Sequence, residues 1–147
     1  MPFPLGINTY SVRAMRWHDA RLLDYAASLK CDAIFLQDSP DPDAQNPAHW
    51  PIVKRRAEEL GLHLETGGGA TLPRTPEQFE ERVAYLKGQI RRAAALGSPI
   101  VRTLTASDRY ALPPGPTEQH IATMVRVLKA VRNEAIDHQV KVAIEVH

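Results

Sequence analysis

The sequence has little cysteine, no long apolar run and almost no excess charge of either sign. Cys31 is its single cysteine, so no internal disulfide can form, and one thiol fits a reducing compartment. No apolar stretch approaches the roughly 20 residues of a membrane helix. The residues MPFPLGINTY lack the basic and apolar segments of a signal peptide. Lys and Arg number 18 against 17 Asp and Glu, so we expect neither a nucleic acid nor a membrane as partner. These features predict a soluble cytoplasmic protein.

Five short apolar segments read as β-strands, because they are rich in Ile, Val, Leu or Thr and are bounded by turn residues. They are residues 5–10, 33–38, 62–67, 99–105 and 140–147. Amphipathic patterns between them predict four helices. The third of these has an apolar face from Phe79 to Ala93 and ends at Gly97. The fourth is expected to bury one face, made of Ile121, Met124, Val125, Leu128, Val131 and Ala135.

The alternation of strands and helices predicts an α/β protein with a parallel sheet and right-handed crossovers. We expect a single domain over residues 1–147, a (βα)4β unit. Two architectures fit: the first half of a (β/α)8 TIM barrel, or an open five-stranded flavodoxin-like sheet. An open sheet usually has a helix after its fifth strand, and none follows here. The end of the sequence at the fifth strand therefore favours an incomplete barrel.

Long polar segments follow three of the strands, at the end where α/β folds bind ligands. They are residues 39–48, 67–75 and 106–116. Gly67, Gly68 and Gly69 lack the Lys-Ser/Thr of a phosphate-binding loop, so we interpret them as a flexible exit from the third strand. The histidines, His49 among them, form no H-x-x-x-H or HExxH pattern, so no metal is assigned to them.

Polar residues at the strand ends are the candidates for a functional site. Glu145 and His147 are two residues apart and therefore point to the same side of the last strand. Glu65 and Arg102 are charges inside apolar strands and need partners. A pairing between these two would explain both structurally. The remaining candidates are Asn8, Tyr10 and Gln37.

The segments LGINTYS, AEELGLHLE, AALGSPIVR and VAIEVH, in this order and spacing, resemble the N-terminal part of the xylose isomerase-like superfamily of TIM barrels. The resemblance implies a sugar or sugar-phosphate isomerase or epimerase. It makes Glu145 a catalytic residue and a ligand of Mn²⁺, Mg²⁺ or Co²⁺, with Zn²⁺ as an alternative. It also makes His147 a catalytic residue, placed near the substrate or metal. We expect the substrate-binding residues to be Asn8, Tyr10, Gln37, Glu65 and Arg102.

The other metal ligands of that superfamily come from strands six to eight, which this sequence lacks. We therefore predict that the chain alone is inactive and is the N-terminal part of a longer enzyme. A metal-dependent dehydratase of a cyclic polyol or keto-acid would use the same glutamate. A third interpretation is a non-catalytic half-barrel module that self-associates through its open sheet edges. An endonuclease IV-like enzyme is disfavoured, because no histidine ends an early strand and the net charge is only +1.

Overall fold

The computed structural model describes residues 4–37, 39–106 and 115–145. Its strands are β1 (Gly6–Asn8), β2 (Ala33–Gln37), β3 (His63–Ala70), β4 (Ile100–Leu104) and β5 (Lys141–Glu145). Its α-helices are α1 (Asp19–Ser28), α2 (Trp50–Glu59), α3 (Phe79–Leu96) and α4 (Thr117–Asp137). Two short 3₁₀ helices, η1 (Thr9–Met15) and η2 (Pro76–Gln78), precede α1 and α3. No helix of the described residues is long and apolar enough to cross a membrane.

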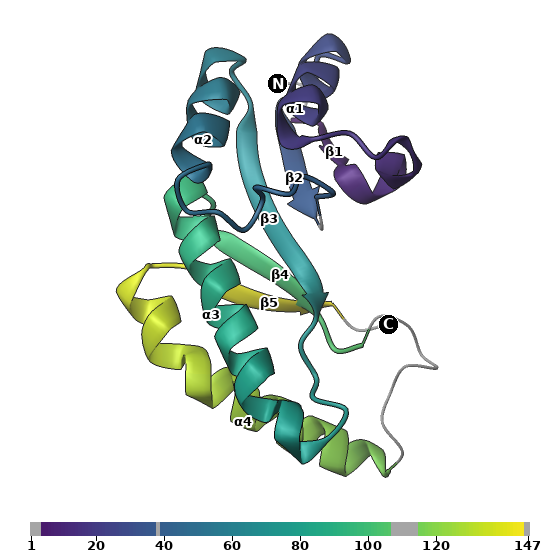
Figure 1. Cartoon of the computed structure of the whole chain (residues 1–147), viewed down its shortest axis with the longest axis vertical. Helices are drawn as coiled ribbons and strands as arrows, with labels where there is room; N and C mark the ends of the chain where they lie inside the picture. Colours follow the sequence, from purple (N-terminus) through teal and green to yellow (C-terminus); the bar gives the residue numbers. More distant parts are fainter. Residues whose placement is uncertain (1–3, 38, 107–114, 146–147) are drawn as a thin grey trace.

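All five strands are parallel and lie side by side in chain order, β1-β2-β3-β4-β5. This order confirms the predicted (βα)4β half barrel. A flavodoxin-like sheet would place β1 inside the sheet, in the order 2-1-3-4-5, so that alternative is wrong. Figure 1 shows the sheet twisting strongly, with β4 and β5 crossing the direction of β2 and β3. Such twist is expected of strands that form part of a barrel wall.

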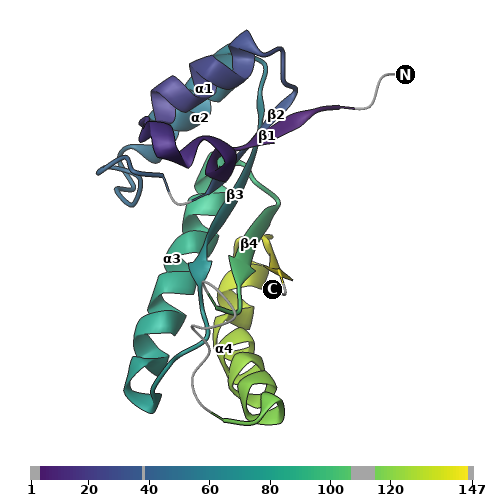
Figure 2. The ribbon, with the colours of Figure 1, turned by 90° about the vertical axis from the view of Figure 1, so that its right-hand side faces the viewer.

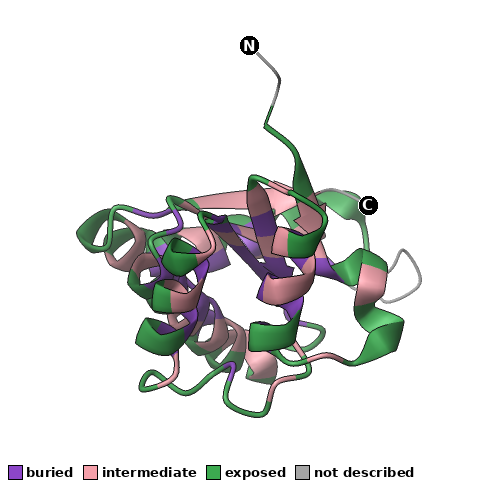
Figure 3. Ribbon diagram, turned by 90° about the horizontal axis from the view of Figure 1, so that it is seen from above, coloured by how far each residue is buried: buried purple, intermediate pink, exposed green. Residues whose placement is uncertain are grey.

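The four α-helices lie along one face of the sheet (Figure 2). Along β2, the residues Ile34 and Leu36 are buried against them, whereas Ala33 and Phe35, which alternate with these two, are only half-buried. Figure 3 shows the buried segments gathered between the helices and the sheet. The core has two parts, one between α1, α2, β2 and β3 and one between α3, α4, β4 and β5. The opposite face of the sheet carries no helix in the described part of the chain and is available for a site.

The glycine run was wrongly predicted as a loop, because β3 continues through it to Ala70. The β3–β4 register shifts between Gly67 and Ala70, which marks a local irregularity in the ladder. A neighbouring helix accounts for Gly68, where a Cβ atom would lie 2.5 Å from the Tyr85 hydroxyl. That hydroxyl accepts the backbone N–H of Gly69 at 2.8 Å. Small residues therefore let α3 approach the strand closely.

The predicted apolar face agrees with the structure more closely on α3 than on α4. On α3 the expected stripe is buried from Val83 to Ala93 and partly buried at Phe79, and Gly97 ends the helix in the left-handed conformation with φ 78°. On α4 the residues buried against α3 and the sheet are Met124, Val127 and Val131. Ile121 and Val125 were expected in that face but are exposed. The apolar stripe of α4 is thus wider than the surface that its described neighbours cover.

Candidate functional site

Five of the predicted site residues share the open face of the sheet. In parallel strands, residues in register point to the same side, and Asn8 is in register with Phe35 and Phe35 with Glu65. Further along, Gln37 is in register with Gly67, and Gly67 with Arg102. Glu145 lies two residues beyond the position opposite Arg102, so it has the same orientation. The open face therefore collects Asn8, Gln37, Glu65, Arg102 and Glu145 from the five strands.

Arg102 is the centre of a polar group on this face. Its guanidinium donates a hydrogen bond to the side-chain oxygen of Gln37 and forms an ion pair with Glu145. These contacts link β2, β4 and β5. The Arg102 side chain is only 19% exposed, so its charge is partly desolvated and its ionic contact is stronger than one in bulk water. The ion pair also gives Arg102 a partner on β5, whereas the sequence suggested Glu65.

Phe35 and Gly67 complete this group and were missed in the sequence. The guanidinium of Arg102 stacks over the Phe35 ring at 4.8 Å from the ring centroid. Position 67 must be small, because a Cβ atom there would lie 2.5 Å from the Phe35 ring and 3.0 Å from the Arg102 carbonyl. The glycine run was the available signal, and it marks a place where an aromatic ring covers the strand.

The other predicted residues lie around this group. Asn8 and Glu65 line a hollow of about 560 Å³ on the open face, together with Phe35. Tyr10 is in η1, half-exposed, and its ring is covered by the Arg13 guanidinium at 3.9 Å. Tyr10 and Gln37 line a second, smaller cavity of about 110 Å³. His147 lies outside the described residues.

A second cluster of titratable side chains lies at the starts of the first two helices. Asp19 begins α1, Asp41 lies between β2 and α2, and His49 directly precedes α2. One ligand atom from each lies within 4.8 Å of the others, a geometry that could hold a metal ion. No metal was assigned to His49 from the sequence, because the histidines form no H-x-x-x-H or HExxH pattern. The available signal was that all three residues follow adjacent strand ends.

Asp41 has a lowered pKa. Burial raises the pKa of this carboxyl, but the backbone N–H groups of Asp43 and Asp19 and the nearby imidazoles of His49 and His18 together outweigh it. The Asp43 N–H lies 3.0 Å from Oδ1 and the Asp19 N–H 3.2 Å from Oδ2. The carboxylate form of Asp41 is therefore favoured, which suits a metal ligand.

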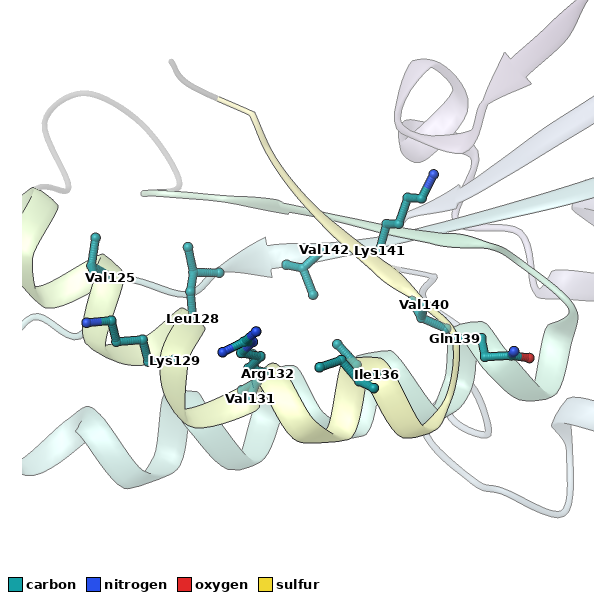
Figure 4. Close-up of a pocket in the computed structure, with 11 residues that line it drawn as sticks. Val125, Leu128, Lys129, Val131, Arg132, Ile136, Gln139, Val140, Lys141 and Val142 are labelled. Atoms are coloured by element: carbon teal, nitrogen blue, oxygen red, sulfur yellow. The ribbon is translucent and has the colours of Figure 1, made fainter.

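An apolar groove of about 640 Å³ runs between α4 and β5 (Figure 4). Apolar side chains from both elements face one another across it, and they include Val125, Leu128, Ile136, Val140 and Val142. Ile136 is 60% exposed. This groove explains why the apolar stripe of α4 is wider than its buried face. It lies beside β5, which is an edge strand of the described sheet.

The order and packing of the strands and helices are those of the N-terminal half of a TIM barrel. The xylose isomerase-like TIM barrel family matches residues 21–147, and the chain belongs to that family. No curated protein matches the chain.

Three solved structures illustrate the fold. The D-psicose 3-epimerase of Clostridium cellulolyticum H10, solved with D-tagatose, has a TM-score of 0.74 and 16% identity, over 98% of this chain and 52% of that one. The xylose isomerase domain protein of Planctomyces limnophilus has a TM-score of 0.70 and 19% identity, over 97% and 52%. The IOLI protein, solved with a binding zinc atom, has a TM-score of 0.77 and 16% identity, over 98% and 51%. The chain thus spans about half the length of these relatives.

Proposed function

We propose that the chain forms the N-terminal half of a metal-dependent sugar or sugar-phosphate isomerase or epimerase. The observation that carries the proposal is the group of polar side chains from five strands on the open sheet face, centred on Arg102. Relatives of the same fold were solved with a sugar. A hollow of about 560 Å³ beside Asn8 and Glu65 is of the size that small-molecule sites have, and it shares Phe35 with the Arg102 group, although Arg102 and Gln37 do not line it.

In this proposal Arg102 and Gln37 bind the substrate. A guanidinium presents parallel N–H donors, which recognise a carbonyl, an alkoxide or a phosphate oxygen. Gln37 adds an amide that can donate to or accept from a sugar hydroxyl. The Phe35 ring beneath the guanidinium supplies an apolar surface for the carbon face of a sugar. Asn8, Glu65 and Tyr10 would contact other parts of the substrate.

Glu145 is the proposed metal ligand, but the described residues do not complete a metal centre around it. The group of described side chains that could hold a metal does not include Glu145, and its ionic partner is Arg102. One carboxylate holds a catalytic divalent ion poorly. In the complete enzyme, strands beyond residue 147 would supply the other ligands, and the ion would polarise substrate oxygens as a Lewis acid. The chain alone is then inactive.

The test compares the 147-residue chain with the longest product of the reading frame that contains it. Both are assayed with Mn²⁺, Mg²⁺ or Co²⁺ for ketose epimerisation and aldose–ketose isomerisation. We expect activity in the longer product, its loss in Glu145→Gln, a raised KM in Arg102→Gln and little change in Glu134→Gln, which removes a carboxylate from the helix side. Dehydration of a cyclic polyol or keto-acid without isomerisation would overturn the proposal in favour of a dehydratase on the same fold.

The α4–β5 groove favours a second candidate function, a non-catalytic half-barrel module. An edge strand beside an apolar groove is a surface that another polypeptide can cover. A second copy of the chain would bring the same open edge and the same groove. Stable self-association with no activity in any longer product would support this candidate over the enzyme.

A further inference from the structure

The cluster of Asp19, Asp41 and His49 is separate from the site on the open face. It belongs to the helix layer, where Arg92 of α3 reaches it. Neither Arg102 nor Glu145 contributes to it. The proposed sugar site therefore does not account for this cluster.

The cluster contains buried polar atoms that no described group satisfies. The Asp19 side chain is only 1% exposed, and its Oδ1 atom makes no hydrogen bond. The Nε2 atom of His49 is also buried without a hydrogen-bond partner. Burying a carboxylate oxygen and an imidazole nitrogen without partners is costly, so something should bind between them.

The distances suit a cation between these atoms. His49 Nε2 lies 3.9 Å from Asp19 Oδ2 and 3.7 Å from Asp41 Oδ2. These separations are too long for hydrogen bonds. Metal–ligand distances of about 2.0–2.1 Å in a tetrahedral site place neighbouring ligand atoms roughly 3.3 Å apart. A contraction of about half an ångström would therefore bring His49 Nε2 to that separation from each of the two carboxylates, whose own ligand atoms lie within 4.8 Å of each other.

The charges leave room for a cation. Arg92 lies 3.8 Å from Asp19 Oδ2 and offsets one of the two carboxylates. Beside the second carboxylate the described titratable side chains are imidazoles, since His18 Nδ1 and His49 Nε2 each lie 3.7 Å from Asp41 Oδ2, and two backbone N–H groups donate to it as well. The His18 side chain beside Asp41 is 62% exposed, so this side of the cluster is close to solvent.

We infer that Asp19, Asp41 and His49 bind one Zn²⁺ or a similar first-row divalent ion. Two carboxylates with one imidazole form a nitrogen–oxygen set that suits Zn²⁺ and Co²⁺. All three ligands follow the ends of β1 and β2. The ion would tie the start of α1 to the segment before α2, so its role is structural. This inference does not depend on the proposed enzyme activity.

The experiment titrates Zn²⁺ into the metal-free protein by calorimetry and Co²⁺ by visible absorption. We expect one site, the strong d–d bands of tetrahedral Co²⁺, and a higher midpoint of thermal unfolding in Zn²⁺. His49→Gln should remove the site. His138→Gln is the matched control, because His138 also lies beside a carboxylate, 3.3 Å from Glu134 Oε1, but on α4. Glu145→Gln should leave binding at the Asp19–Asp41–His49 cluster unchanged. This variant therefore distinguishes the cluster from the metal site proposed for the enzyme at Glu145.

Two outcomes would overturn the inference. If the folded wild-type protein binds neither ion, the cluster is a network of polar and ionic contacts around Arg92 and needs no metal. If binding persists at full stoichiometry in His49→Gln and falls in His138→Gln, the ion sits elsewhere. Asp41→Asn supplies a second test should His49→Gln fail to fold, because Asp41 is on an irregular segment and its removal spares the helix core.

Discussion

Thr9 joins the ends of β1 and β2 through its hydroxyl. The hydroxyl donates to the Gln37 carbonyl at 3.0 Å and accepts the Gln37 N–H at 2.9 Å, and Thr9 is 5% exposed. We predict that Thr9→Val lowers the free energy of unfolding by about 1–3 kcal/mol, because both backbone groups lose a buried partner while the shape is kept. Urea unfolding would measure the change. Thr117→Val, at an exposed helix start, is the control, and equal effects of the two substitutions would contradict the argument.

At the residue scale, the polar side chains at the strand ends were easier to predict from the sequence than the groups that they contact. Alternation along a strand was enough to find Gln37, Arg102 and Glu145, because residues in register share a face. It did not predict that the Phe35 ring lies under Arg102, because this stacking depends on the rotamers of two side chains on different strands. The roles of Glu145 and His147 stay predictions.

The cluster of Asp19, Asp41 and His49 could not be predicted from spacing. Its residues come from the start of α1 and from the segment between β2 and α2, and they meet only because α1 and α2 pack side by side on the sheet. Local periodicity describes one helix or strand at a time and carries no information on how two helices pack against each other. Only the shared position of the three residues after strand ends pointed to it.

At the scale of elements, two glycines on neighbouring segments should respond oppositely to alanine. A Cβ atom at Gly68 in β3 would lie 2.5 Å from the Tyr85 hydroxyl, whereas one at Gly88 in α3 meets nothing within 4 Å. We predict that Gly68→Ala destabilises the protein by about 1–3 kcal/mol, since it pushes Tyr85 away from the Gly69 N–H. Gly88→Ala should stabilise it by about 0.5–1 kcal/mol, because alanine favours the helix. Thermal unfolding of both variants tests this, and a destabilised Gly88→Ala would show that α3 is packed more tightly there.

An ion pair joins α3 to α4 and should give stability that depends on pH. Arg91 Nε donates to Glu134 Oε1 at 2.6 Å, and this hydrogen bond lowers the pKa of Glu134 below its ordinary 4.5, although burial opposes it. Because the folded-state pKa is depressed, the contribution is present above pH 4.5 and is lost as the pH falls through the folded-state pKa. We predict that Glu134→Gln costs up to about 1 kcal/mol near pH 7 and less in acid.

A double-mutant cycle measures this coupling. Urea unfolding of the wild type, Arg91→Gln, Glu134→Gln and the double variant at pH 7 and at pH 3 isolates the pair. The coupling should fall in acid and in high salt, because Arg91 is 55% exposed and its charge is screened. A coupling that is the same at both pH values would mean that the two residues interact through packing.

The apolar face of a helix was predictable from the sequence where the helix packs against a single surface. The α3 stripe is one such case, because the helix packs on the sheet with one face. The α4 stripe was misread, since its apolar residues serve two surfaces, the core at Val127 and Val131 and the groove at Val125 and Ile136. Periodicity alone does not separate these two faces.

At the scale of the whole molecule, the parallel sheet follows from the alternation of strands and helices, but the strand order does not, and only the observed pairing separates the half barrel from the open flavodoxin-like sheet. What distinguishes them is whether β1 lies at an edge, a long-range contact that periodicity does not encode. The described sheet has edges at β1 and β5, and each edge offers unpaired backbone groups. The apolar groove beside β5 adds a surface that favours coverage.

We therefore predict that the 147-residue chain self-associates as its concentration rises. Analytical ultracentrifugation should show a rising mean mass, and Ile136→Lys should shift the association to higher concentration, because it places a charge in the α4–β5 groove. Ile52→Lys is the matched control, since Ile52 is 57% exposed on α2 against 60% for Ile136 on α4, and it lines no part of that groove. Neither change removes a core contact, so both variants should unfold at similar urea concentrations. A chain that stays monomeric, or an equal effect of the two lysines, would mean that the groove is not a contact between copies and that only a further segment of a longer chain could cover it.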